Sequence, residues 1–346
     1  VMPQYFKLAK KNACGAEFII NQIGYDARKQ DELLKYMTRE GLSVPAFGNV
    51  YVLNGAAARV FNASRIPGVV VSDALLAVAE KQAGSEDKGK AFFIELAAKQ
   101  CAIHRGLGYR GVYIGGNLKY EDYERILELE KGFGADDWKQ FATQIQYSRP
   151  GEFFVFEAEG ESGLSSTDLN REYAASKTDR GQRQIRAQLN LGYKVNRAVH
   201  SLLFEKGTLG FALARKLYEK LDDSRLKGAA HSMEHGAKIA AFDCRDCGDC
   251  SLPDIAYLCP ESQCVKNQRN GPCGGTRSGQ CEIGEKECIW SRAYKRLKAY
   301  GEEEEMLNRP VVFKDGGLKG TSAWANTFLQ RDHHAKNEGT GVTHED

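Results

Sequence analysis

The cysteines of this chain are concentrated in one short segment. Only Cys14 and Cys101 lie elsewhere, and the other eight of the ten fall between Cys244 and Cys288. The first residues lack the apolar core of an export signal, so we do not expect a disulfide framework in this segment. Eight clustered thiols instead predict a metal site in a protein of a reducing, cytoplasmic compartment.

The spacing of these cysteines favours an iron–sulfur cluster. Their order is Cys244-x2-Cys247-x2-Cys250-x8-Cys259-x4-Cys264-x8-Cys273-x7-Cys281-x6-Cys288. Three thiolates drawn from seven consecutive residues can bind one [4Fe–4S] cubane, because each short loop returns the chain to the same inorganic face. Ferredoxin-type binding adds a remote cysteine followed by proline, as Pro260 follows Cys259 here.

We therefore expect Cys244, Cys247 and Cys250 to ligate one centre. The fourth ligand is expected to be Cys259, Cys264 or Cys288, and the remaining cysteines should form a second site or line the first. Zinc is the main alternative, because tetrahedral four-thiolate sites also use cysteines separated by two residues. Free structural thiols are the third possibility.

The first part of the chain alternates short apolar runs with helical stretches. Strands are predicted over residues 16–22, 44–53 and 111–114, and helices over 26–39, 54–62, 87–106 and 120–131. Residues 67–80 fit either a strand or a helix. Strands that alternate with helices are typical of βαβ units and a parallel sheet. Residues 1–132 are thus predicted to be α/β, with only three firm strands.

The second part, residues 133–346, is predicted to be a mostly α-helical, cysteine-rich domain whose metal-binding block spans residues 242–290. It should contain one β-like run at 152–157 and helices at 184–204, 209–221 and 291–307. The net charge of +2 gives no electrostatic reason to expect nucleic acid or an anionic membrane as a partner. Apolar runs such as residues 74–79 are far shorter than a membrane span.

The cysteine block resembles a known family. The segments that carry the resemblance are Cys244-Arg-Asp-Cys247-Gly-Asp-Cys250, Cys259-Pro260, Asn270-Gly-Pro-Cys-Gly-Gly275, Gly279-Gln-Cys-Glu282 and Cys288-Ile-Trp290. They are similar to the C-terminal domain associated with methylenetetrahydrofolate reductases. In anaerobic one-carbon pathways a similar module occurs as a small subunit beside the reductase, where it is linked to iron–sulfur or zinc binding.

The first region resembles the last strands of the reductase barrel, which implies a partial (β/α) TIM-type barrel over residues 1–132. Residues 15–26 are similar to a family strand that ends in Thr-Gln, three aromatic residues and Asp. The resemblance implies that Gln22 contacts the folate pterin and that Tyr25 stacks near it. Asn21 replaces the threonine, and Ile23 and Gly24 replace two aromatic residues. Barrel enzymes place their chemistry at such strand ends.

The resemblance implies an oxidoreductase of folate one-carbon metabolism and methionine biosynthesis. Such an enzyme reduces 5,10-methylenetetrahydrofolate to 5-methyltetrahydrofolate through FAD or FMN, with a nicotinamide or a redox protein as electron donor. The strands that would carry the catalytic acid and most flavin contacts are not among the three predicted here, so the catalytic residues stay unnamed. A partial barrel would expose unpaired strand edges and an apolar sheet face. We expect that the chain is a fragment, or that a reductase subunit or a second copy completes the sheet, and that the chain alone binds flavin poorly.

Two other functions are compatible with these patterns. The chain could be a non-catalytic iron–sulfur or zinc subunit that transfers electrons to such a reductase or serves as its scaffold. A corrinoid or pterin methyltransfer protein would share the barrel and the pterin site. It ranks last, because the chain has no Asp-x-His-x-x-Gly cobalamin motif.

Overall fold

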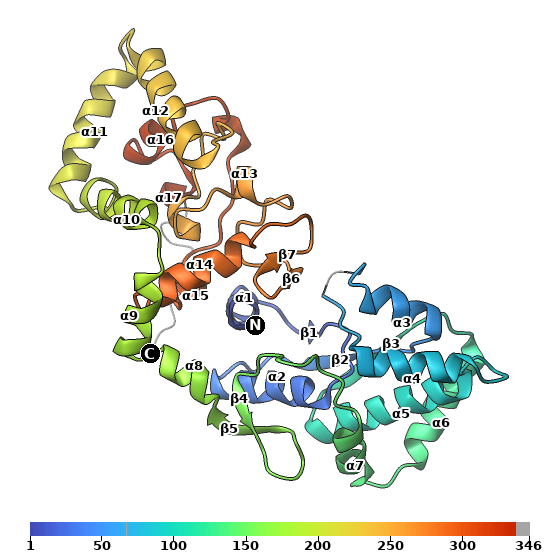
Figure 1. The fold of residues 1–346 in the computed structure, drawn as a ribbon. Helices are drawn as coiled ribbons and strands as arrows, with labels where there is room; N and C mark the ends of the chain where they lie inside the picture. Colours follow the sequence, from blue (N-terminus) through green and yellow to red (C-terminus); the bar gives the residue numbers. More distant parts are fainter. Residues whose placement is uncertain (67, 337–346) are drawn as a thin grey trace. The chain divides into compact units, whose positions relative to one another are not determined.

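A computed structural model describes residues 1–66 and 68–336 (Figure 1). The chain forms two compact units. Unit 1 consists of Val1–Tyr5 and Lys11–Ala174, and unit 2 consists of Phe6–Lys10 and the chain from Ala175 onward. The first unit thus continues past residue 132, where the sequence suggested a domain boundary.

Unit 1 contains a three-stranded parallel sheet in the order β1-β2-β3. The strands are β1 (Ile19–Ile20), β2 (Ala46–Tyr51) and β3 (Gly111–Gly115). Ile19 pairs with Ala46, and Phe47 pairs with Gly111. The predicted α/β class with three parallel strands is confirmed, and the assignment of this sheet to a TIM-type barrel stays a prediction.

Helices alternate with the strands of unit 1 along the chain. They are α1 (Met2–Ala13), α2 (Ala27–Arg39), α3 (Gly55–Asn62), α4 (Asp73–Ala83), α5 (Lys90–Leu107), α6 (Tyr120–Gly132) and α7 (Asp137–Gln144) (Figure 1). Asp26, Asn54 and Ser72 cap α2, α3 and α4, since each side chain accepts a hydrogen bond from the backbone N–H three residues later. The ambiguous stretch at 67–80 therefore becomes a helix only after Ser72.

The core of unit 1 lies between one face of the sheet and α5. Phe93, Ala97 and Ile103 of α5 are buried there together with Val50 of β2. His104 packs directly over Gly48, where a Cβ would lie 2.0 Å from the His104 ring. The absence of a side chain at Gly48 thus lets α5 approach the sheet.

The opposite face of the sheet is open. Phe18, Ile20 and Tyr113 are 55%, 48% and 58% exposed, respectively, and the partly buried Phe47 packs edge-on against Phe18. Among residues 1–66 and 68–336, the two outer strands, β1 and β3, each pair only with β2. Unpaired edges and an apolar face are the two features expected of a partial barrel.

Unit 1 ends in an antiparallel hairpin of β4 (Phe156–Ala158) and β5 (Ser165–Leu169). Two buried acids of α2 hold it in place. Glu32 accepts hydrogen bonds from the Tyr5 hydroxyl at 2.9 Å and from the backbone N–H of Val155, and Asp31 accepts one from the backbone N–H of Ser165 at 2.8 Å.

Unit 2 is mostly helical. Its longer helices are α9 (Asp179–Ala187), α10 (Leu191–Leu203), α11 (Leu209–Asp222), α12 (Lys227–Phe242) and α14 (Ile289–Lys298), and α8 (Arg171–Ser176) precedes them. Short elements are η1 (Pro253–Ile255), α13 (Pro260–Gln263), β6 (Thr276–Arg277), β7 (Gln280–Cys281), α15 (Glu305–Asn308), η2 (Gly316–Leu318), α16 (Ala323–Phe328) and α17 (His333–Lys336). None of the helices in the described ranges could span a bilayer by length and apolarity.

Two predicted helices of unit 2 are interrupted. The helix expected over 184–204 breaks after Ala187, because the Asn190 side chain caps a new helix by accepting a hydrogen bond from the Tyr193 N–H. The helix expected over 291–307 ends at Lys298, close to Gly301, whose φ of +73° is incompatible with a right-handed helix.

Candidate metal centres

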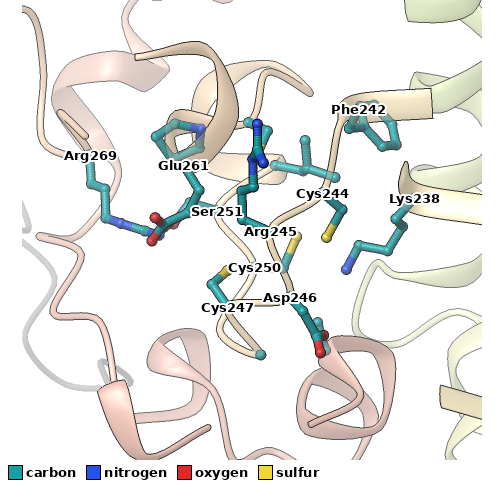
Figure 2. Close-up of a pocket in the computed structure, with 15 residues that line it drawn as sticks. Lys238, Phe242, Cys244, Arg245, Asp246, Cys247, Cys250, Ser251, Glu261 and Arg269 are labelled. Carbon is teal, nitrogen blue, oxygen red and sulfur yellow. Dashed lines mark hydrogen bonds and ion pairs between the residues drawn. The ribbon is translucent and has the colours of Figure 1, made fainter. Parts of the chain in front are cut away.

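The eight clustered cysteines separate into two sets of four, each around its own pocket. The triplet pocket is lined by Cys244, Cys247, Cys250 and Cys259, and the second pocket is lined by Cys264, Cys273, Cys281 and Cys288 (Figure 2 shows the triplet pocket). All eight thiols are free of disulfides. Of the three candidates for the fourth position beside the triplet, the structure places Cys259 there and the other two in the second pocket.

The loop of the triplet pocket turns sharply after α12. Asp243 and Asp246 adopt left-handed conformations with φ of +53° and +52°. Gly248 has a φ of +72°, and a Cβ at this position would lie 1.7 Å from the Leu318 carbonyl oxygen. Only glycine fits this turn, which folds the three sulfur-bearing residues around one space.

A buried lysine of α12 faces the triplet pocket. Figure 2 shows the Lys238 amine directed toward Cys244. Lys238 forms a 3.1 Å ion pair with Glu234 one turn earlier, and both side chains are buried. Burial alone would lower the pKa of Lys238, but Cys250, Glu234 and Cys244 together raise it above the ordinary value. The Lys238 ammonium, paired with Glu234, therefore lies beside these sulfurs.

Burial makes the thiols of this pocket difficult to ionise without a cation. It raises the pKa of Cys250 to about 11 and also raises the pKa of Cys244, and Lys238 only partly counteracts both changes. Thiolates rather than thiols ligate metals, and a bound metal favours the deprotonated form. The pocket is thus suited to a positively charged inorganic group that would stabilise its thiolates.

Arg269 connects the two stretches that line the triplet pocket. Its guanidinium donates hydrogen bonds to the Ser251 hydroxyl and to the Glu261 carboxylate, both at 2.5 Å. Ser251 directly follows Cys250, and Glu261 lies two residues after Cys259. Burial would raise the pKa of Glu261, but hydrogen bonds from Lys314, Asn267 and Arg269 lower it to about 2. Glu261 is therefore a constant anionic partner for Arg269.

The second pocket is built from turns with backbone N–H groups directed at sulfur. The N–H groups of Gln268, Gly275 and Ile283 lie 3.5, 3.4 and 3.5 Å from the sulfurs of Cys264, Cys273 and Cys281, respectively. Gly275 packs against Glu282, whose carboxyl carbon would lie 1.9 Å from a Cβ there. Hydrogen bonds of this kind to cysteine sulfur help to set the potential of iron–sulfur clusters.

The distances between sulfurs separate the two kinds of metal site. A single zinc ion holds four sulfurs about 3.8 Å apart, because Zn–S bonds of about 2.3 Å point to the corners of a tetrahedron. Within residues 1–66 and 68–336, only Asp254, His333 and His334 bring three potential ligand atoms within 4.8 Å of one another. No three of the cysteine sulfurs are among them, so neither set of thiols is gathered to the spacing of a four-thiolate zinc site in this structure.

The two residues expected to contact folate are placed differently in unit 1. Gln22 follows β1, is exposed, and its side-chain oxygen accepts a 2.9 Å hydrogen bond from the Ile23 N–H. Tyr25 is 2% exposed and donates a 3.0 Å hydrogen bond to the Tyr51 carbonyl. Gln22 can reach a ligand as it stands, whereas the Tyr25 ring is part of the core.

Sequence reasoning did not identify Lys238 and Arg269 as parts of the triplet pocket. The spacing of Glu234 and Lys238, one helical turn apart and just before Cys244, could have indicated a buried pair. Nothing local marks Arg269, since its partners lie 18 and 8 residues away.

Comparison with known proteins identifies the cysteine-rich segment. A family described as "Methylene-tetrahydrofolate reductase C terminal" matches residues 224–316, a range that includes all eight cysteines of the two pockets. No curated protein and no solved structure matches the chain. The resemblance of the cysteine block is therefore confirmed: residues 224–316 are a domain related to the C-terminal domain of methylenetetrahydrofolate reductase.

Proposed function

We propose that this chain is part of a methylenetetrahydrofolate reductase-type oxidoreductase and that its two cysteine pockets each bind a [4Fe–4S] cluster. The observation that carries the proposal is the division of eight cysteines into two sets of four within a domain related to that reductase. When bound, the clusters would supply one-electron transfer to the FAD or FMN that reduces 5,10-methylenetetrahydrofolate. A reducing cytoplasm would keep the thiols available.

Residues of the chain would hold and tune these groups. Cys244, Cys247, Cys250 and Cys259 would ligate the first cluster, and Cys264, Cys273, Cys281 and Cys288 the second. The Lys238 ammonium would offset the negative charge of the first thiolate set, and backbone N–H groups would do so in the second pocket. Zinc is the alternative occupant, since four thiolates can also form a tetrahedral zinc site.

In this proposal, the residues that contact folate lie in unit 1. Gln22 would orient the pterin, because its exposed amide lies at the carboxyl end of a parallel strand, where barrel enzymes bind their substrates. Tyr25 would support this loop from inside the core through its hydrogen bond to Tyr51. The electron donor to the clusters would be a nicotinamide-dependent partner or a redox protein.

Metal analysis of serine variants tests the cluster proposal. Anaerobically purified protein should contain about eight iron and eight sulfide per chain, as two [4Fe–4S] clusters require. Cys247→Ser and Cys281→Ser should each lose about half of both, because each removes a ligand from a different pocket. Cys14→Ser is the matched control, since Cys14 lies outside both pockets, and it should retain the full content. Stoichiometric zinc without iron, or full iron in both variants, would contradict the proposal.

A second candidate function is that of a non-catalytic electron-transfer or scaffold subunit. The open apolar face of the β1-β2-β3 sheet favours it, because such a face is normally covered by another part of a barrel or by a partner. Flavin binding distinguishes the two functions. A subunit would bind FAD and FMN weakly by itself and would form a stable complex with a flavin-loaded reductase, whereas tight flavin binding by this chain would favour catalysis.

A further inference from the structure

A second type of side-chain cluster lies outside both cysteine pockets. Nε2 of His333 lies 3.0 Å from one carboxylate oxygen of Asp254, and Nε2 of His334 lies 2.9 Å from the other. Of all the residues that the structure describes, these three alone bring three potential metal ligands within 4.8 Å of one another. Neither histidine was part of any motif in the sequence, because Asp254 lies 79 and 80 residues before them.

The second ring nitrogen of each histidine also faces a carboxylate. Nδ1 of His333 hydrogen bonds to Asp249, and Nδ1 of His334 lies 3.5 Å from Asp332. Histidines that ligate metals almost always interact through their other nitrogen with a carboxylate, a carbonyl or water, which fixes the ring and selects the tautomer. Here the Nδ1 atom of each ring faces such a carboxylate, and the Nε2 atoms of both rings face the carboxylate of Asp254.

The outer carboxylates are themselves held rigidly. Asp249 also accepts hydrogen bonds from the N–H groups of Asp315, at 2.8 Å, and of His333, at 3.2 Å. Asp332 accepts a 2.7 Å hydrogen bond from the Thr327 hydroxyl. Asp249, Asp332 and His333 are all buried, whereas the side chain of His334 is 30% exposed. The cluster is thus preorganised and reachable from the His334 side.

We propose that Asp254, His333 and His334 bind one divalent transition-metal ion of the zinc type, separate from the cysteine sites. Two imidazole nitrogens and one carboxylate oxygen form a donor set that suits zinc, iron or nickel better than magnesium or calcium. In a tetrahedral site with bonds of about 2.0–2.1 Å, ligand atoms lie about 3.4 Å apart. The Nε2 atoms of His333 and His334 now lie 3.0 and 2.9 Å from different oxygens of Asp254. These separations would need to widen by only a few tenths of an ångström. Three protein ligands leave a position for water on the exposed side.

The charges of the cluster agree with a cation at its centre. Three carboxylates, those of Asp249, Asp254 and Asp332, surround two imidazoles, and the ion pairs found for them in the described ranges involve only these two histidines. Because both nitrogens of each ring face carboxylates, the two rings carry positive charge when no metal is bound, and a divalent ion would take the place of the protons on their Nε2 atoms. It would also fasten α17 to η1, which follows the cysteine triplet by only a few residues.

Cobalt(II) is a suitable probe in the full-length protein with its cysteine sites reconstituted. Thiolate ligation of cobalt gives strong near-ultraviolet charge-transfer absorption, whereas nitrogen and oxygen ligation gives only weak visible bands. We expect one equivalent of cobalt with the second signature, and loss of that equivalent in His334→Gln and in Asp254→Asn. Asp332→Asn should weaken binding about 10–100-fold, the usual effect of removing an outer partner of a ligand.

The controls separate this site from the cysteine pockets. His235→Gln alters a histidine of α12 outside the cluster and should bind cobalt as the unmodified chain does. Iron and sulfide contents should stay unchanged in His334→Gln and Asp254→Asn, which shows that these variants remain folded. Two outcomes would overturn the proposal and identify the cluster as a metal-free ion-pair network. Either both variants bind as much cobalt as the unmodified chain, or all cobalt bound by the unmodified chain shows thiolate absorption. Neither result depends on what the cysteine pockets bind.

Discussion

Arg269 shows how one side chain can hold a metal-binding pocket together. It is 9% exposed and connects Ser251 with Glu261, so that the triplet loop and the stretch after Cys259 are fixed to each other. Glu261 is only partly buried, with 18% of its side chain exposed, so loss of this pair should cost less than the roughly 3–5 kcal/mol typical of a fully buried ion pair. Lys314 also contacts Glu261 and would retain part of the compensation.

We expect Arg269→Ala to lower the free energy of unfolding of unit 2 by about 2 kcal/mol, the usual contribution of hydrogen bonds to a charged group. Urea-induced unfolding of the reconstituted protein, followed through cluster absorption, measures the change. Arg225→Ala removes an exposed arginine of the same unit and should change this free energy by less than about 0.5 kcal/mol. Equal stability of the two variants would show that Arg269 does not hold the pocket together.

Local signals predicted single residues well where the chemistry is local. The spacing indicated that Cys244, Cys247 and Cys250 share one site with Cys259, Cys264 or Cys288, and the structure gathers the triplet and Cys259 around one pocket. The choice among three candidates for the fourth position could not be made from spacing, because it depends on how the chain returns through α13. Arg269 and the His333–Asp254 contacts could not be predicted, since they join residues distant in sequence.

At the scale of elements, α12 places a charged side chain in the triplet pocket. Lys238 is buried, and its ion pair with Glu234 places it on the side of the helix that faces Cys244 and Cys250. A positive charge close to a cluster stabilises the reduced, more negative state and so raises the reduction potential. Glu234 also accepts a hydrogen bond from the Trp324 N–H at 3.1 Å, which joins α12 to the start of α16.

The double variant Glu234→Gln/Lys238→Met should lower the reduction potential of the cluster in the triplet pocket by tens of millivolts, about 1 kcal/mol for a single electron. Changing both residues avoids leaving a lone buried charge. Potentiometric titration followed by electron paramagnetic resonance measures the shift. The potential of the second cluster serves as the internal control, and an equal shift of both potentials would contradict a local effect of Lys238.

Helix starts were predicted more accurately than helix ends. Asp26 and Asn54 were followed by helices as expected, because a capping side chain needs only the next three residues. The breaks at residues 188–190 and after Lys298 lie within runs of helix-forming composition, where apolar periodicity continues through the interruption. Short helices such as α13 and α17 carry too few residues for a periodic signal.

At the scale of the whole molecule, the two units differ in how they are stabilised. Unit 1 has an extensive apolar core built around α5 and the sheet, whereas the apolar core around Trp290 in unit 2 contains only eight buried residues. Several leucines of α10 and α11 in unit 2 are exposed, including Leu209 at 85%. Metal binding should therefore contribute much of the folding free energy of the cysteine-rich segment.

Removal of the clusters by oxidation and chelation should unfold the cysteine-rich segment and leave unit 1 folded. Hydrogen exchange measures this directly. Backbone amides of residues 244–290 should lose protection from exchange after iron is removed, while amides of α5 should keep theirs because Phe93, Ala97 and Ile103 remain buried. Retained protection throughout residues 244–290 would show that the apolar contacts suffice without metal.

The sequence predicted the α/β class and the three parallel strands, because each strand and helix of unit 1 has its own local pattern. It did not reveal that the compact part continues to Ala174, since that depends on α2 acids pairing with a distant hairpin. The open sheet face was expected from the low number of strands and is present in the structure.

The two sets of cysteines follow one another along the chain without interleaving. All four cysteines of the triplet pocket precede Cys264, the first cysteine of the second pocket. In two-cluster ferredoxins, by contrast, the fourth cysteine of each run ligates the other cluster, so that both depend on the complete chain. Here the first set is complete once Cys259 has emerged from the ribosome. The cysteines of the first site are thus synthesised before those of the second, whereas Arg269, which holds the triplet pocket together, is synthesised only after Cys264.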